Sequence, residues 1–93
     1  MNDQNFASVW DAIEESPAEA ENMKLRSILM MALEDRIRDQ GWTQAEAARQ
    51  LGVTQPRISD LARGKINLFG LDTLVNMAVA AGLHIEMRVA KAA

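Results

Sequence analysis

The 93-residue sequence contains no cysteine and a single histidine, His84. Without cysteine the chain forms no disulfide, no iron–sulfur cluster and no thiolate zinc site, and this composition favours a cytoplasmic protein. One histidine cannot supply a histidine-rich metal site or pair with a second histidine around a nucleophile. We therefore expect no metal, no cofactor and no enzymatic activity.

Long apolar segments are also missing. The longest apolar run, Ile28 to Leu33, is far shorter than the ~20 residues that span a bilayer, so we expect no membrane partner. Residues 1–5 have neither the basic nor the apolar region of a signal peptide, which again predicts a cytoplasmic protein. The length fits one small domain, and a domain of this size gains stability from oligomerisation.

The net charge of −3 argues mildly against nucleic acid as a partner, but the charge is unevenly distributed. Residues 1–22 hold six carboxylates and no Lys or Arg, whereas the rest of the chain holds ten basic and seven acidic groups. The acidic segment is either a solvated leader or an arm for a basic partner protein. The rest of the chain, residues 23–93, therefore carries more basic than acidic groups.

Capping patterns and glycines predict a long helix. Ser16 to Glu19 form a capping box with Pro17 at the first helical position, so a helix should run from Pro17 to about Gln40 and stop at Gly41. The residues expected on its buried stripe are Leu25, Ile28, Leu29, Ala32, Leu33 and Ile37.

Other residues of this helix fall beside the stripe. Arg36 drifts toward it, so the last turn should be partly exposed or let Arg36 snorkel. Met30 and Met31 flank the stripe and indicate a second contact surface. The basic residues Lys24, Arg26 and Arg38 are expected to be ordinary surface charges.

Three shorter helices should follow. A second capping box begins at Thr43, Thr54 is the next N-cap, and Gly52, Gly64 and Gly82 end the three helices. The residues expected to face the core are Trp42, Ala47, Ala48, Leu51, Ile58, Leu61, Phe69, Leu71, Leu74, Val75, Ala78 and Val79.

After Gly82 the apolar period changes from 3.6 to 2. Leu83, Ile85, Met87 and Val89 alternate with polar residues, which predicts a half-buried strand. A lone strand must pair with the same strand of a second chain or with the N-terminal leader. We expect symmetric antiparallel pairing in a homodimer, with Ile85, Met87 and Val89 at the interface.

The two short helices around Gly52 have the spacing of a DNA-binding helix-turn-helix. Ala48 is small where the helices cross, and Val53, Ile58 and Leu61 attach the pair to the core. The second helix presents short polar groups and guanidinium, which suit the reading of base edges and phosphates. These outward residues are Thr54, Gln55, Arg57, Ser59, Asp60 and Arg63.

At these residues the chain resembles the Xre/Cro-like helix-turn-helix family, over about residues 25–82. The match is carried by Trp42 to Ala48 and Leu51 to Ser59. The small size, the segment Leu71 to Leu74 and the C-terminal strand further resemble HigA-type antitoxins. The resemblance implies a mainly helical, lambda-repressor-like domain of four or five helices that binds a palindromic operator in double-stranded DNA as a dimer.

The resemblance also implies roles for individual residues. Gln44 would hydrogen-bond a phosphate, and Gln55 and Arg57 would contact bases. Thr54 and Ser59 would help to position the helix on the DNA or to read its bases. The backbone clamp would consist of Arg63, Lys65 and Asn67. Pro56 departs from the pattern by occupying a site where base-contacting side chains are common, so the expected contact there is an apolar one with a thymine methyl. Asp60 is expected to pair with Arg57 or Arg63, or to accept from a cytosine amine.

The predicted function is a sequence-specific repressor, nucleoid-associated through its DNA, and the antitoxin of a small basic RelE/HigB-like ribonuclease toxin. The alternatives are a stand-alone regulator and a protein-interaction adaptor. Three regions are expected: an acidic leader (1–22) with a possible short helix, a DNA-binding domain (23–82) and a dimerisation strand (83–93). The leader residues expected to bind the toxin are Phe6, Val9, Trp10, Ile13, Glu14 and Glu15.

Overall fold

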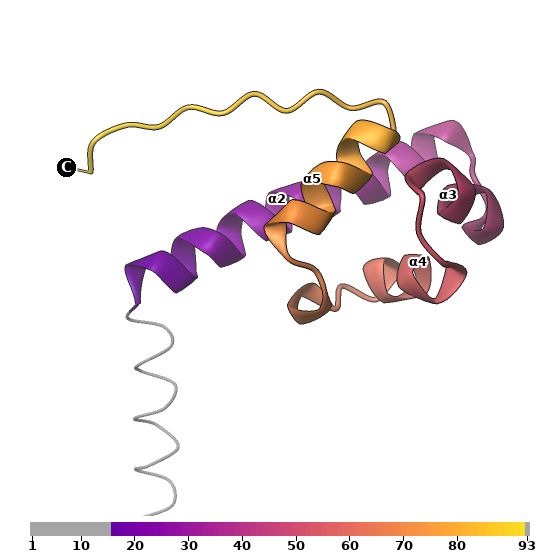
Figure 1. Ribbon diagram of the computed structural model, residues 1–93, viewed down its shortest axis with the longest axis horizontal. Coiled ribbons are helices and arrows are strands. Elements are labelled where there is room, and N and C mark those ends of the chain that lie inside the picture. The colour runs from indigo at the N-terminus through magenta and orange to yellow at the C-terminus, as the bar shows by residue number, and fades with distance from the viewer. Residues whose placement is uncertain (1–15, 93) are drawn as a thin grey trace, which may run out of the picture.

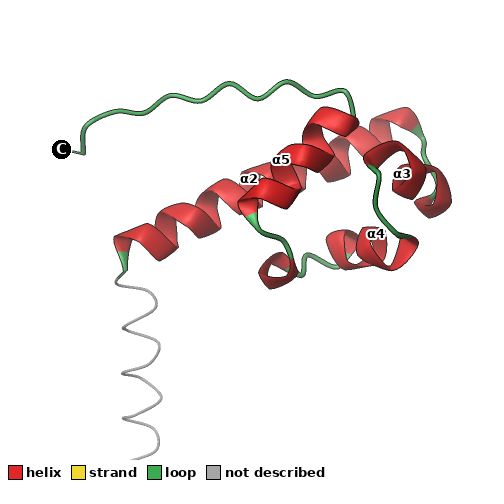
Figure 2. Cartoon of the chain, viewed as in Figure 1, coloured by secondary structure: helices red, strands yellow, loops and turns green. Residues whose placement is uncertain are grey.

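The computed structural model describes residues 16–92, which form four α-helices and one 3-10 helix (Figure 1). They are α2 (Pro17–Gln40), α3 (Gln44–Leu51), α4 (Gln55–Ala62), η1 (Ile66–Leu68) and α5 (Leu71–Ala80). The prediction of a mainly helical fold is confirmed. No β-strand is present among these residues (Figure 2). The predicted leader helix and the toxin-binding residues between Phe6 and Glu15 lie outside the described residues.

The long helix α2 has the predicted bounds. The Ser16 hydroxyl accepts a hydrogen bond from the Glu19 amide at 3.2 Å, and Gly41 ends the helix with a φ of 69°. Only glycine adopts that left-handed conformation without strain, so the residue fixes where α2 stops. The first turns of α2 project beyond the other helices, and its later turns lie beside α5 (Figure 1).

The core lies where α2, α3, α4 and α5 meet. Its largest fully buried side chains are Phe69, Leu33, Leu61, Leu74 and Met77. The inward residues predicted for the two short helices, Ala47, Ala48, Leu51, Ile58 and Leu61, are all buried. Phe69 is buried as predicted, and Trp42 is partly buried against the same cluster.

The predicted stripes of the two longer core helices were partly wrong. Ile28 is 53% exposed, Val75 37% and Val79 62%. Met30, which was expected beside the stripe, and Met77 are buried instead. Periodicity identifies an apolar sector, but the position of the neighbouring helix decides which part of that sector is covered. The apolar sectors of α2 and α5 are wider than their neighbours cover.

Arg36 has a defined role beyond the predicted partial exposure or snorkelling. Its Nε donates to the Ala81 carbonyl at 2.8 Å, and the side chain is partly buried. This bond satisfies a carbonyl at the end of α5, where helices leave such groups without partners. Gly82 follows with a φ of 86° and turns the chain back.

Residues 83–92 run back alongside α2 as an extended segment (Figure 1). The Leu83 amide donates to the Ala78 carbonyl, and no backbone–backbone hydrogen bond within residues 16–92 involves residues 84–92. Leu83 and Ile85 are half-buried as predicted, but Met87 is 74% exposed and Val89 85% exposed. The predicted half-buried strand is therefore not confirmed for the outer half of the segment, because residues 16–92 offer it neither a partner strand nor a covering surface. Strand pairing between chains stays a prediction.

Candidate nucleic-acid interface

The predicted helix-turn-helix is formed by α3, a tight turn and α4. The Thr43 hydroxyl accepts from the Glu46 amide at 3.1 Å and begins α3, which confirms the second capping box. Gly52 has a φ of 70°, and the amide of Val53 donates to the Ala48 carbonyl at 3.0 Å. These local bonds set the angle at which α4 leaves the turn, and α4 packs directly against α3.

The first turn of α4 is open to solvent. Thr54, Gln55 and Pro56 are all exposed. The Thr54 hydroxyl makes no capping hydrogen bond to its own helix, so it is free to bond to an external group. Exposed donors and acceptors at the start of a helix are well placed to meet base edges or phosphates, because backbone amides also point outward there.

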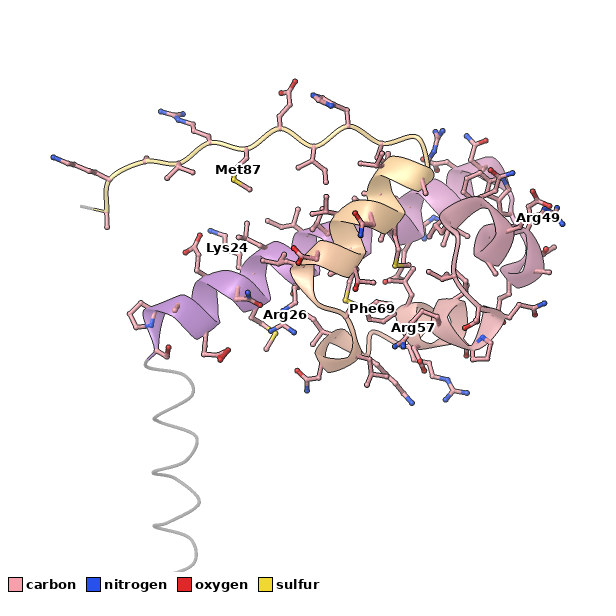
Figure 3. The ribbon with its side chains drawn as sticks, in the orientation of Figure 1. Lys24, Arg26, Arg49, Arg57, Phe69 and Met87 are labelled. Atoms are coloured by element: carbon pink, nitrogen blue, oxygen red, sulfur yellow. The ribbon has the colours of Figure 1, made fainter. Side chains whose placement is uncertain are left out.

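Arg57 lies one residue further on and makes several contacts within the chain. Its Nη1 donates to the Leu68 carbonyl at 3.2 Å, and its guanidinium carbon lies 5.4 Å from the centre of the Phe69 ring (Figure 3). Its side chain is 41% exposed. Arg57 therefore connects α4 to the loop after it, and part of its guanidinium still faces outward.

Asp60 lies between two cations. Its carboxylate oxygens are 4.0 Å from Arg57 Nη1 and 3.9 Å from Lys65 Nζ. The pairing with Arg57 agrees with the sequence prediction, and the second partner is Lys65 and not Arg63. The negative charge of Asp60 is thus offset locally by two positive charges.

The loop after α4 carries the remaining predicted DNA-binding residues. Arg63, Lys65 and Asn67 are exposed, and Ser59 is half-buried on α4. The Lys65 amide donates to the Asp60 carbonyl at 3.1 Å, which ties the loop to the helix.

The loop is also held from the opposite side. Arg26 Nη1 on α2 donates to the Ile66 carbonyl at 3.1 Å, and its Nε is buried without a hydrogen-bond partner among the described residues. The expectation that Arg26 is an ordinary surface charge was wrong, because it fastens η1 to α2. Lys24 and Arg38 are exposed as expected.

Gln44 begins α3 and is exposed. It borders a shallow hollow that Ile58 and Ala62 of α4 also line. The structure therefore brings the start of α3 next to α4, as simultaneous contact with one ligand would require. Arg49, by contrast, lies at the outer end of α3 and pairs with Glu46 (Figure 3).

Taken together, the arrangement of α3, turn and α4 defines a helix-turn-helix domain. The chain belongs to the helix-turn-helix domain family, whose match spans residues 12–90. It is similar to a solved structure of a proposed XRE-family transcriptional regulator, with 30% sequence identity and a TM-score of 0.73. That alignment covers 80% of this chain and 83% of the other. No curated protein matches the chain.

Residues 16–92 also lack two other features. No helix in this part of the chain is long and apolar enough to cross a bilayer. These residues also contain no group of three or more His, Asp or Glu side chains arranged to hold a metal ion.

Proposed function

We propose that the protein is a DNA-binding transcriptional regulator that places α4 in the major groove of double-stranded DNA. The observation that carries this proposal is the exposed first turn of α4, held at a fixed angle by α3 and the Gly52 turn. The similarity to a proposed XRE-family regulator supports it. The location would be the cytoplasm, on the nucleoid.

The exposed side chains suit separate tasks on DNA. Gln55 can bond bidentately to adenine, and Pro56 offers an apolar contact for a thymine methyl. Arg57 would use its outward donors on a base or phosphate, with Thr54 and Ser59 as smaller hydrogen-bonding groups. Gln44 would bond a phosphate from the start of α3.

The distribution of charge also favours α4 and the loop after it as the surface that meets DNA. The segment from Arg57 to Lys65 contains three cations and one carboxylate, and that carboxylate is already paired. Lys65 and Arg63 would bond phosphates, with Asn67 beside them, and release counterions from the DNA. The net charge of the whole chain therefore does not describe the surface that would meet DNA.

Two substitutions test this division of roles. Gln55→Ala should weaken binding to the preferred DNA by about 1–3 kcal/mol and change random DNA little. Lys65→Ala should weaken all sequences alike and lower the salt slope by about one. Arg49→Ala, on the outer end of α3, is the matched control and should leave both affinities unchanged. Equal effects of Gln55→Ala on preferred and random DNA would overturn base reading by α4.

We also propose that two copies bind a palindromic operator. One α4 covers only a half-site, and paired half-sites reflect a two-fold axis in the protein. The apolar alternation of residues 83–89 and the exposed Met87 and Val89 support an additional chain contact. Sedimentation of the free protein and titration with operator DNA would measure the two stoichiometries.

A finer proposal is that the regulator is an antitoxin of the HigA type that neutralises a small basic ribonuclease and represses its own operon. The acidic residues 1–22 support it, because six carboxylates without a cation complement an RNA-binding surface. Co-expression with the adjacent small reading frame tests it. Failure to co-purify and to restore growth would leave a stand-alone transcriptional regulator.

A further inference from the structure

Asp60 is the single acidic residue between Gln55 and Asn67, on the surface proposed to meet DNA. Its side chain is only 25% exposed, and its carboxylate oxygens lie 4.0 Å from Arg57 Nη1 and 3.9 Å from Lys65 Nζ. Because phosphates repel a carboxylate, Asp60 opposes the approach of any DNA. A residue with that cost is expected to act through the cations that it contacts.

The end of α4 places Lys65 next to Asp60. Gly64 follows the helix with a φ of 70°, and its amide donates to the Leu61 carbonyl at 3.0 Å. The Lys65 amide then donates to the Asp60 carbonyl at 3.1 Å. These two bonds form the Schellman motif that commonly ends a helix. Since the turn fixes the backbone of Lys65, the carboxylate has a cation beside it that limits its repulsion of DNA.

Arg57 precedes Asp60 by one helical turn on α4. Its Nη1 also donates to the Leu68 carbonyl at 3.2 Å, and its guanidinium lies over the Phe69 ring (Figure 3). Three contacts therefore hold Arg57 in one orientation before DNA binds, and the contact with Asp60 is the one that depends on charge. A side chain that is already ordered loses less conformational entropy when it contacts a ligand.

Specific and non-specific complexes make different demands on an arginine. On random DNA, affinity comes from cations that reach the nearest phosphates, so a freely moving guanidinium is an advantage. On a preferred sequence the guanidinium must meet one base edge in one orientation. A carboxylate that holds Arg57 in place thus weakens the first kind of complex more than the second.

We infer that Asp60 is a positioning residue that keeps Arg57 directed at a base edge instead of at phosphates, and that it thereby determines specificity. This inference rests on the proposed function, because it concerns the same surface of α4. It assigns to Asp60 the task of lowering affinity for random DNA. Specificity is a difference between two affinities, so a repulsive or restraining group increases it when it penalises the wrong ligand more.

Asp60→Asn tests the inference in the full-length protein, because asparagine removes the charge and nearly preserves the shape. The DNA probes are a duplex that the wild type selects from a randomised pool and a shuffled duplex of the same composition. Affinity for the shuffled duplex should rise about three- to tenfold and become more salt-dependent, because the surface gains net positive charge. Affinity for the selected duplex should change less, so the preference falls. A merely structural role would lower both affinities, and circular dichroism checks that the variant is folded.

Two control variants separate charge from other effects. Asp60→Glu keeps the charge and should keep the low affinity for the shuffled duplex. Asp35→Asn removes a carboxylate that is paired with Arg38 on α2, where both side chains are well exposed. It changes the net charge by the same amount as Asp60→Asn but should leave the preference unchanged. An equal loss of preference in Asp35→Asn would overturn a local role of Asp60.

A double-mutant cycle with Arg57→Ala tests whether Asp60 acts through Arg57. In that background Asp60→Asn should raise both affinities alike and leave the preference unchanged. A further fall in preference would overturn the inference, and so would an effect of Asp60→Asn confined to one cytosine, which would indicate direct base contact. A wild type that selects no sequence from the pool would overturn the proposed function as well. A selective wild type with an equally selective Asp60→Asn variant would overturn this inference alone.

Discussion

The guanidinium of Arg57 lies over the ring of Phe69, with 5.4 Å between its carbon and the ring centre. Arg57 belongs to α4, whereas Phe69 is buried in the core just after η1. The contact therefore joins the helix proposed to read DNA to the loop proposed to hold the phosphates. The hydrogen bond from Arg57 to the Leu68 carbonyl adds to the same connection.

This relationship predicts that Arg57 contributes to stability as well as to DNA binding. Arg57→Lys keeps the positive charge but loses the planar fork that bonds Leu68 and stacks on Phe69. We expect the free energy of unfolding to fall by about 1 kcal/mol, as measured by urea denaturation. Arg63→Lys, at an exposed loop position, is the control and should be neutral. An unchanged stability of Arg57→Lys would show that the residue serves DNA alone.

The turn between α3 and α4 yields a second prediction. Gly52 has a φ of 70°, so Gly52→Ala places a side chain in the left-handed region at a cost of about 1–2 kcal/mol. No atom lies within 4 Å of an added Cβ, so the cost comes from backbone conformation and not from a clash.

Gly70 provides the comparison for Gly52. It begins α5 with a φ of −79° and also has open space around it. Gly70→Ser should be neutral or stabilise by a few tenths of a kcal/mol, because serine is a better N-cap. Thermal unfolding of the two variants measures the difference, and an equal Tm for both would contradict this explanation.

A third prediction concerns the end of α5. Arg36→Ala removes the donor to the Ala81 carbonyl and should destabilise the fold by about 1–3 kcal/mol. Gly82→Ala should also destabilise, because its φ is 86° and an added Cβ would lie 3.0 Å from Arg36 Nη2.

The effects of Arg36→Ala and Gly82→Ala on the free energy of unfolding should not be additive. In the Arg36→Ala background the close contact is gone, so Gly82→Ala should then cost only its backbone strain. A double-mutant cycle in urea measures the coupling, and strict additivity would contradict a direct interaction between these positions. A fall in dimerisation is also expected, since this turn directs residues 83–92 back along α2.

The sequence predicted the helices well, because capping residues and glycines act locally. Ser16, Thr43 and Gly41 determine ends of helices through bonds to residues within four positions. The buried faces were harder to predict. Ile28 and Met30 differ by two positions on one helix, and only the placement of α5 and η1 decides which is covered.

In the candidate site, too, local features could be predicted from the sequence and contacts between distant residues could not. The exposure of Thr54, Gln55 and Pro56 could be anticipated from the helix-turn-helix spacing. The contact of Arg57 with Phe69 could not, because it depends on how the loop folds back over 12 positions. Arg26 was misassigned for the same reason, since its partner Ile66 lies 40 residues away.

Leader removal provides a fourth prediction. Deleting residues 1–15 removes four carboxylates and leaves the Ser16 cap of α2 in place. DNA affinity should stay the same or rise, because repulsion from the phosphates decreases. Titration at low salt would show the largest gain. A marked loss of affinity would mean that the leader contributes to DNA binding.

The central claim is that this helix-turn-helix reads a specific DNA sequence. The most direct measurement is the affinity of the intact protein for the DNA upstream of its own gene and for a shuffled duplex, at several salt concentrations. We predict tighter binding to the upstream DNA, by about 10³-fold or more, with both affinities falling as salt rises. Equal affinity for the two duplexes, or no salt-dependent binding to either, would contradict the account.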